Sequence, residues 1–268
     1  MNKLVNCGLE NRFGTNCLKW DGLKSRFGNE NLIAMWVADM DFKAPQPVID
    51  ALKERVNHGI FGYNIIPDSY YEAFINWEKE KHGYNVKKEW IRFSPGVVPA
   101  LFWFINILTN PGDSCIVMGP VYYPFHDAIK ENERKLIFNN LKNDNGIYTI
   151  DFEKFEEDII ENQVKLFILS SPHNPIGRVW TKEELKRVLD ICKANDVFVL
   201  ADEIHQDIII GDKKQIPAAT IGNYDDILVT LTAATKTFNL ASCQNSFVVI
   251  PNDEIREKFD KYYNSIGG

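Results

Sequence analysis

The chain has 268 residues, of which 45% are hydrophobic and 25% are charged, a composition typical of a globular protein with a buried core. Its formal net charge is −7, and no cluster of lysines and arginines offsets it, which argues against a nucleic-acid partner. No apolar run approaches the roughly 20 residues of a membrane-spanning helix, and residues 1–13 lack the apolar centre of a secretory signal. We therefore expect a cytoplasmic protein with no membrane partner.

The cysteines are few and widely spaced, and none of them forms a C-x-x-C pair. They are Cys7, Cys17, Cys115, Cys192 and Cys243. This pattern favours reduced cysteines over disulfides or a zinc site, and we expect no bound metal.

Regular structure is expected from Pro45 onward, after an irregular segment at residues 1–44. Helical periods and short apolar runs alternate along the rest of the chain. Helices are expected at residues 45–56, 69–82, 95–109, 124–131, 151–160 and 183–195. Strands are expected at residues 91–94, 114–119, 135–141, 165–170, 197–202, 227–234 and 245–251.

Capping residues mark several of the helix starts. Asp68 is expected to cap the helix at 69–82, and Thr181 forms a capping box with Glu184. Apolar strands that alternate with amphipathic helices predict an α/β fold, with a mostly parallel sheet flanked by helices on both faces. In such sheets ligands bind beyond the carboxyl ends of the strands, where several polar clusters of this chain lie.

The sharpest of these clusters is Asp202-Glu-Ile-His205, at the end of an apolar strand. Acid pairs of this form also occur in helicase-type ATPases, but the phosphate-binding loop that such enzymes need is absent from the sequence. A charged surface turn is the simpler alternative, and the motif alone does not decide between that turn and a functional site.

Lys236 follows the expected strand at 227–234 and lies 34 residues (236 − 202) beyond Asp202. A single lysine is usually a surface residue. An enzyme that uses pyridoxal 5′-phosphate (PLP), however, needs a lysine to form a Schiff base and an acid to keep the pyridine nitrogen protonated. Lys236 and Asp202, each at a strand's carboxyl end, meet that requirement.

Three further clusters follow expected strands. Asn174 could donate to the phenolate oxygen of the cofactor, although an Asn-Pro turn explains it equally well. Val97 and Val98, at a helix N-terminus, offer free backbone N–H groups to a phosphate, as many helices do. Tyr122 could stack on the pyridine ring or simply pack against the protein.

Taken in order, the segments SPGVV, PVYYP, SPHNPIGRVW, DEIH and TKTFNL resemble the fold-type I PLP enzymes of aminotransferase class I/II. The segments TNCLKWD (15–21), MWVADMDF (35–42), FGY (61–63) and PDSYYEA (67–73) are similar to the cystathionine β-lyase branch of MalY/PatB-type C–S lyases. The resemblance implies that residues 1–44 belong to a small domain and border the pocket, while residues 45–268 form the large PLP-binding α/β domain. It also implies a C-terminally truncated chain, in which the small C-terminal domain is missing.

The resemblance assigns roles to the residues of the clusters. Lys236 would hold PLP and later move the α-proton, and Asp202 would pair with the pyridinium nitrogen. Asn174 and His205 would lie near the ring oxygen, and Tyr122 would stack on the ring.

Other implied roles concern the phosphate, the substrate and a second subunit. Val97 and Val98 would bind the phosphate through their backbone. Tyr63 would reach the phosphate in the neighbouring subunit, which implies a homodimer with shared active sites. The residues that would border the substrate pocket are Trp36, Val37 and Asp39.

The implied reaction is α,β-elimination of cystathionine or other cysteine S-conjugates to pyruvate, ammonia and a thiol. An aminotransferase of the same fold and an inactive or regulatory remnant are the alternatives. Two features depart from the family pattern: Ser242-Cys243 replaces Gly-Leu, and no arginine is assigned as the clamp for the substrate carboxylate. Only Arg12, Arg26 and Arg178 are left as candidates for that role, by elimination.

Overall fold

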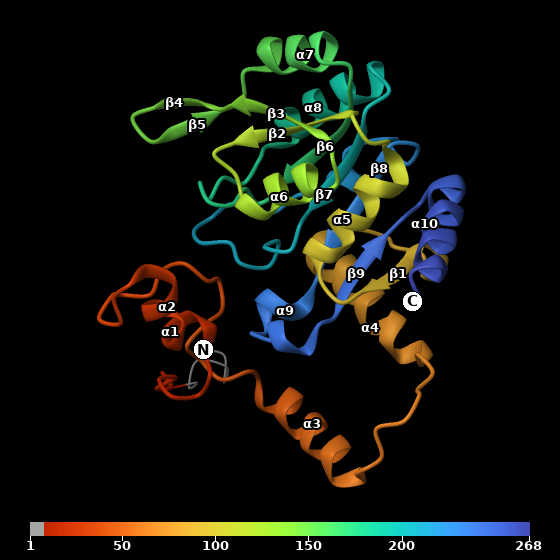
Figure 1. Ribbon diagram of the computed structural model, residues 1–268. Coiled ribbons are helices and arrows are strands. Elements are labelled where there is room, and N and C mark those ends of the chain that lie inside the picture. Colours follow the sequence, from red (N-terminus) through yellow and green to blue (C-terminus); the bar gives the residue numbers. More distant parts are fainter. Residues whose placement is uncertain (1–7) are drawn as a thin grey trace. The chain divides into compact units, whose positions relative to one another are not determined.

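The computed structural model describes residues 8–268, so Cys7 and most of the segment examined for a signal lie outside the described residues (Figure 1). The described residues form two compact units. The first, here called the N-terminal unit, runs up to Ile65 and includes Ala234–Gln244. The second, the sheet unit, comprises Ile66–Ala233 and Asn245–Gly268.

A seven-stranded sheet forms the centre of the sheet unit, with the order β1-β9-β8-β7-β6-β2-β3. Only β9 runs antiparallel to its neighbours, so the other six strands share one direction. This confirms the predicted mostly parallel α/β sheet. The strands are β1 Ile91–Ser94, β2 Ser114–Gly119, β3 Lys135–Asn140, β6 Val164–Ser170, β7 Phe198–Asp202, β8 Leu228–Thr232 and β9 Ser246–Val249.

Both faces of the sheet are buried because successive residues of each strand point to opposite sides. Ile116 and Phe167 face a core that includes α7 (Phe152–Glu161) and α8 (Lys182–Ala194). Val117 and Ile168 face a second core, formed with the helices of the other side. Those helices are α5 Val97–Leu108, α6 Tyr123–Glu131 and α10 Asp253–Ser265 (Figure 1).

The capping box that the sequence predicted before α8 is confirmed. Thr181 N donates to Glu184 Oε2 at 2.8 Å, and Glu184 N donates to Thr181 Oγ1 at 3.1 Å. The prediction for Asp68 is wrong, because Pro67 occupies the N-cap position and Asp68 is the first residue of α4 (Asp68–Trp77). The Asp68 carboxylate instead accepts a hydrogen bond from Lys88 Nζ at 2.5 Å.

Two other predicted boundaries shift. The helix predicted from Pro95 begins at Val97, because Gly96 is extended. The helix predicted to reach His82 changes at Glu78 into a π-helix, η2 (Glu78–His82). Elements that the sequence did not predict are α10, the hairpin β4 (Lys142–Asp144) and β5 (Ile147–Thr149), and the 3₁₀ turns η3 (Lys88–Trp90) and η4 (Ala218–Thr220).

The N-terminal unit contains several short helices, of which α1 and α2 lie within residues 1–44, where the sequence predicted irregular chain. Its elements are α1 Leu18–Asp21, α2 Leu23–Phe27, α3 Gln46–His58, α9 Ala234–Thr237 and the 3₁₀ turn η5 Ala241–Cys243. The helix α3 follows Pro45, as predicted, and ends at Gly59, whose φ of 72° suits glycine. Within the described part of the chain, no helix has both the length and the apolarity required to cross a membrane.

Candidate functional site

The carboxyl ends of the parallel strands lie together at one edge of the sheet unit. Asp202, the last residue of β7, pairs in register with Ser170 at the end of β6 and with Leu231 of β8. Its side chain is buried at this edge, and Oδ1 accepts a hydrogen bond from Ile204 N at 3.1 Å. A carboxylate in this position can meet a ligand at the end of the sheet.

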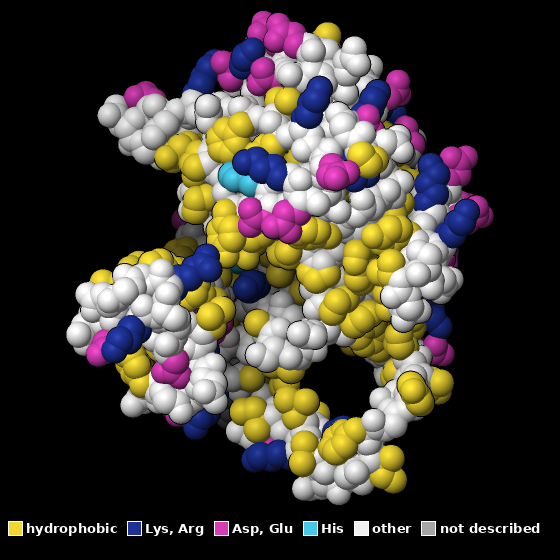
Figure 2. Space-filling view, in the orientation of Figure 1, with side chains coloured by type: hydrophobic (Ala, Val, Ile, Leu, Met, Phe, Trp, Pro, Cys, Tyr) yellow, Lys and Arg dark blue, Asp and Glu magenta, His cyan; other side chains and the backbone are white. Residues whose placement is uncertain are grey.

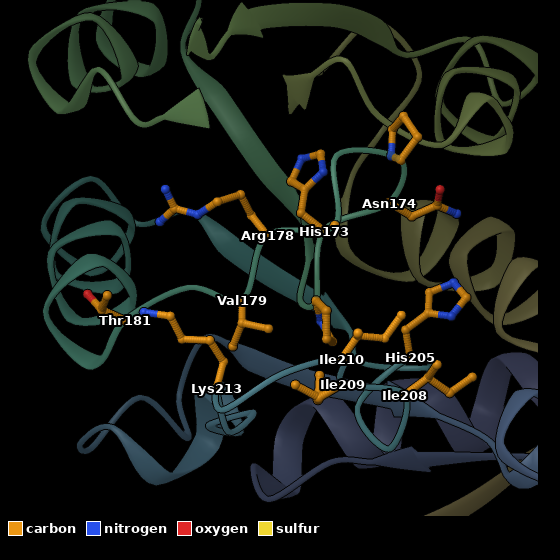
Figure 3. A pocket seen from close by; sticks show the side chains of 13 residues that line it. His173, Asn174, Arg178, Val179, Thr181, His205, Ile208, Ile209, Ile210 and Lys213 are labelled. Carbon is orange, nitrogen blue, oxygen red and sulfur yellow. The ribbon is translucent and has the colours of Figure 1, made fainter. Parts of the chain in front are cut away.

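The turn after β6 is bound to the end of β7. Ser171 N donates to Asp202 O at 2.9 Å, and Asn174 N donates to Ser170 Oγ at 3.0 Å. Asn174 and His205 then line a cleft of about 570 Å³. Figure 3 shows their side chains at one end of this cleft, with Thr181 and Lys213 at the other. The structure thus brings Asn174 and His205, which the sequence placed in separate motifs, to one cavity.

His173, beside Asn174, is not a proton carrier at neutral pH. Its Nε2 lies 3.0 Å from Met118 O, and its ring packs edge-on to Trp180. Burial lowers the pKa of His173 to about 4. The neutral ring therefore fixes the turn that carries Asn174.

The N-terminus of α5 lies after β1 at the same edge. No side chain caps it, and Pro99, within its first turn, has no N–H group. Ala100 N is already bonded to Gly96 O at 3.2 Å. The backbone donors of the first turn are therefore those of Val97 and Val98, which suit an anion such as a phosphate.

Tyr122 lies at the N-cap of α6, after β2. Burial raises the pKa of its hydroxyl, with smaller contributions from Tyr123 and from the charge of Asp202. The contribution of Asp202 places this ring in the same electrostatic environment as the carboxylate at the end of β7.

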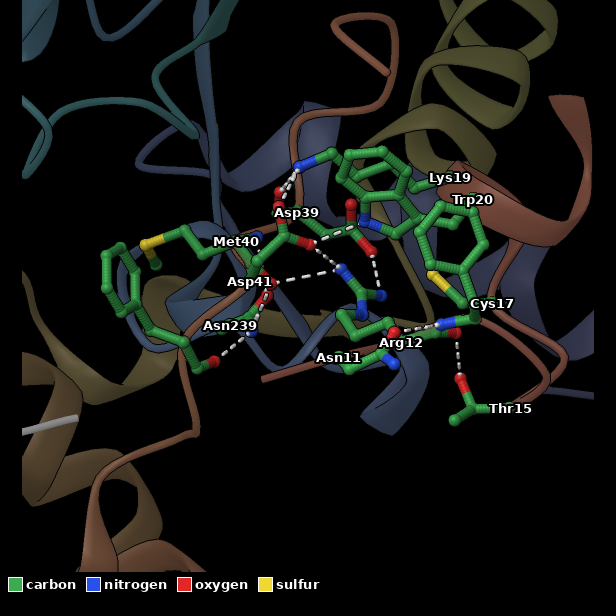
Figure 4. A network of polar contacts seen from close by, with 12 residues as sticks. Asn11, Arg12, Thr15, Cys17, Lys19, Trp20, Asp39, Met40, Asp41 and Asn239 are labelled. Carbon is green, nitrogen blue, oxygen red and sulfur yellow. Dashed lines mark hydrogen bonds and ion pairs between the residues drawn. The ribbon is translucent and has the colours of Figure 1, made fainter. Parts of the chain in front are cut away.

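In the N-terminal unit, a polar network joins the segment 35–42 to the segment 235–240 (Figure 4). Asn239 Nδ2 donates to Met40 O at 3.0 Å and to Phe42 O at 2.8 Å, and Met40 N donates back to Asn239 Oδ1 at 3.0 Å. Lys236 lies on α9, one turn before Asn239. These bonds fix the loop that follows Lys236.

Ser242 and Cys243, which depart from the family pattern, border a cavity of about 330 Å³ in this unit. Asp39 and Asn239 line the same cavity. Trp36 does not line this cavity; its ring packs against Phe27, and its Nε1 donates to Lys19 O at 3.0 Å.

Two of the three arginines considered for the substrate carboxylate are held by protein groups. Arg12 is bonded to Asp39 at 2.5 Å and to Asp41 at 3.0 Å, and the hydrogen bond to Asp39 raises its pKa. Arg178 forms a bidentate pair with Glu184 at 2.6 and 2.7 Å. Arg26 lies over the Trp36 ring, 5.7 Å from its centroid.

Six of the eight predicted site residues lie in the sheet unit, at the carboxyl ends of its strands. They are Asp202, Asn174, His205, Tyr122, Val97 and Val98. Lys236 and Tyr63 belong to the N-terminal unit, and their part in the site stays a prediction. Sequence reasoning missed the buried polar pair behind Asp202, formed by Glu78 and Gln206, because no local pattern links positions 128 residues apart. It also gave no role to Glu203, although Glu203 lies within the Asp202–His205 motif.

Residues 30–265 match the family "Aminotransferase class I and II". The chain is 42% identical to cystathionine beta-lyase PatB of Bacillus subtilis (strain 168) over 97% of this chain and 68% of that protein. It is 31% identical to the protein MalY of Escherichia coli (strain K12), over 96% of this chain and 65% of that protein. The crystal structure of cystalysin from Treponema denticola, which contains a PLP cofactor, superposes with a TM-score of 0.92 at 37% identity, over 97% of this chain and 67% of that one.

The fold and these matches define a protein of the aminotransferase class I and II family, and the chain belongs to that family. Within the family it is similar to the C–S lyase branch of PatB and MalY. The chain spans about two thirds of the length of these relatives.

Proposed function

We propose that the chain binds PLP, with Lys236 as the covalent anchor, and acts as a carbon–sulfur lyase on cystathionine or other cysteine S-conjugates. The observation that carries the proposal is the buried carboxylate of Asp202 at the end of β7, with Asn174 and His205 on one cavity at the same edge. The similarity to PatB and to PLP-containing cystalysin supports it.

The residues of the sheet unit fit the chemistry of PLP. Asp202 would hold the proton on the pyridine nitrogen, and Asn174 and His205 would bind the ring oxygen. Tyr122 would cover the ring. The free N–H groups of Val97 and Val98 would bind the phosphate at the positive end of the α5 dipole.

Lys236 completes this set in the proposal. Three residues separate it from Thr232, the end of β8, and β8 pairs with β7, which ends in Asp202. PLP, when bound, supplies an electron sink for the charge that develops at the substrate α-carbon. With PLP bound, Lys236 Nζ would be the group that takes the α-proton of the substrate. Loss of the β-thiolate as a thiol, followed by hydrolysis of the remaining three-carbon enamine by one water molecule, would give pyruvate and ammonia.

A homodimer with shared active sites is part of the proposal. The helix α3 buries none of its residues, and the chain after it exposes large apolar side chains over residues 60–66. Tyr63 is fully exposed, as a residue that serves a neighbouring subunit would be. Figure 2 shows yellow side chains over α3 at the bottom of the view. Contiguous exposed apolar surface is typical of a protein interface.

We also propose a cytoplasmic location. The four cysteines that the structure describes are all free, and Cys17, Cys115 and Cys192 are buried. Thiols of this kind persist in a reducing compartment.

Product analysis tests the proposed reaction. The purified chain, supplied with PLP, is incubated with cystathionine in the presence and absence of a 2-oxo acid. A lyase releases pyruvate, ammonia and a thiol without the 2-oxo acid. Turnover that requires the 2-oxo acid identifies an aminotransferase, and PLP binding without turnover removes the lyase assignment.

A further inference from the structure

The turn after β7, residues 203–208, connects the candidate site with buried polar residues elsewhere in the sheet unit. Asp202 and His205 belong to the candidate site at the edge of the sheet. Glu203, Gln206 and Asp207 find partners in other parts of the sheet unit. The turn itself is closed by backbone hydrogen bonds from Gln206 N to Glu203 O and from Ile208 N to His205 O, both 2.9 Å long.

The π-helix η2 supplies most of those partners. Gln206 Nε2 donates to Glu78 Oε1 at 2.6 Å, between side chains that are 4% and 2% exposed. Asp207 Oδ1 accepts from Trp77 Nε1 at 3.0 Å and lies 2.8 Å from His82 Nε2. A π-helix bonds residues five apart, which brings Trp77 and His82 to the same side.

Glu203 adds a second buried acid to this cluster. Its Oε1 accepts from Ala218 N at 2.7 Å, and its side chain is completely buried. Burial raises the pKa of Glu203 well above its usual value. Among the described residues, Glu203 Oε2 and Gln206 Oε1 have no hydrogen-bond partner.

Glu78 is the group of this cluster that titrates near neutrality. Burial raises the pKa of Glu78 to about 7, against the opposing effects of His82 and the Gln206 hydrogen bond, and the charge of Asp207 adds to the rise. The other ionisable groups that act within this cluster are Glu203 and Tyr84, which also interact with Asp202 and Asp225. An ionised carboxylate accepts a hydrogen bond about twice as strongly as a neutral one.

We infer that Glu78 is a positioning residue, which through Gln206 holds the turn that carries Asp202 and His205, and that protonation of Glu78 loosens this hold. Asp207, bound to Trp77 and His82, is a second anchor of the same turn. The inference depends on the proposed function only for the consequence that the turn presents Asp202 and His205 to PLP.

Hydrogen–deuterium exchange on the full chain without PLP tests the hold itself. After correction for the intrinsic rate at each pH, the amides of Gln206 and Ile208 should be about tenfold better protected at pH 8 than at pH 6. Glu78→Gln should remove this difference, and Glu80→Gln, an exposed control in the same π-helix, should retain it. A pH difference that persists in Glu78→Gln overturns the inference.

A double variant in which the two side chains are exchanged guards the test against a folding defect in the single variant. Glu78→Gln combined with Gln206→Glu restores one amide and one carboxylate, and should recover the pH-dependent protection. Gln206→Met, which keeps the length and removes the amide, should lose it. A double variant that behaves like Glu78→Gln alone contradicts the role of the pair.

PLP affinity, followed by the absorbance of the bound cofactor between pH 6 and 8, gives the second readout. The ratio of the PLP affinity at pH 8 to that at pH 6 should be about tenfold smaller in Glu78→Gln than in Glu80→Gln. Equal pH profiles in these two variants overturn the inference. If the wild type binds no PLP, the proposed function fails, and the exchange measurement still decides the role of Glu78.

Discussion

Replacement of His173 by glutamine should make the protein less sensitive to acid. His173 is 2% exposed, and its Nε2 lies 3.0 Å from Met118 O. A carbonyl oxygen only accepts, so Nε2 carries the hydrogen and a second proton would have to go to Nδ1. Nδ1 is buried, with no hydrogen-bond partner in the described part of the chain. Charging the folded ring would therefore bury an unsatisfied donor.

The size of the effect follows from the pKa of His173, which falls from 6.5 to about 4 on burial. Between these values the unfolded chain binds a proton that the native protein does not, so the free energy of unfolding falls as the pH falls. The full difference corresponds to about 3 kcal/mol, of which about 2 kcal/mol is lost at pH 5. In global unfolding, which returns its buried carboxyl group to water, Glu78 acts in the opposite sense, since its raised pKa makes stability fall as the pH rises from 4.5 to about 7. Taken by itself, the hydrogen bond from Gln206 lowers the pKa of Glu78, so that bond is stronger when Glu78 is ionised and still buried.

Because these two slopes partly cancel, the measurement compares variants. Glutamine can donate to Met118 O but does not titrate, so His173→Gln isolates the histidine. Urea unfolding at pH 8 and pH 5, followed by tryptophan fluorescence, gives the free energy of unfolding. From pH 8 to pH 5 the wild type and His58→Gln, an exposed control, should lose about 2 kcal/mol more than His173→Gln. An identical pH dependence in His173→Gln and the wild type would refute the reasoning.

Three further predictions concern a helix cap, the cofactor acid and the dimer. Thr181→Ala removes the capping box of α8 and should lower the free energy of unfolding, measured in urea, by about 1 kcal/mol. The control Thr149→Ala, at an exposed position on β5, should change this free energy by less than half as much. Equal losses in the two variants would contradict the role of the cap. Asp202→Ala should leave PLP weakly bound and the enzyme nearly inert, and near-normal turnover would argue against the pyridinium role. Phe61→Glu places a charge in the exposed apolar segment and should convert the proposed dimer to a monomer in sedimentation velocity. A dimer that persists in this variant would place the interface elsewhere.

The strands of the sheet could be predicted from the sequence, because buried parallel strands are nearly continuous apolar runs. The run at 114–119 is β2 to the residue, and Thr181 with Glu184 forms the predicted cap. The error at Asp68 has a local cause, since the side chain forms an ion pair with Lys88 instead of bonding the helix backbone. The helix α10 was within reach of the sequence, because Asn252 caps it and Ile255 and Phe259 share its buried face.

Part of the candidate site could be predicted from the rule that ligands bind beyond the carboxyl ends of the strands in a parallel sheet. That rule brings together Asp202 and Asn174, each at or after the end of a strand. It says nothing about Glu78, whose partner Gln206 is 128 positions away and whose role depends on a change from α- to π-helix. Long-range polar pairs of this kind have no local period, and only the structure reveals them.

Borohydride reduction of the PLP-loaded protein, followed by peptide mapping, tests the central claim most directly. Reduction makes the bond between the cofactor and its lysine permanent, so mass spectrometry can locate it. We predict a single labelled peptide that contains Lys236, and no label or cofactor absorbance band in Lys236→Ala. A label on another lysine, or an unchanged band in Lys236→Ala, would contradict the assignment.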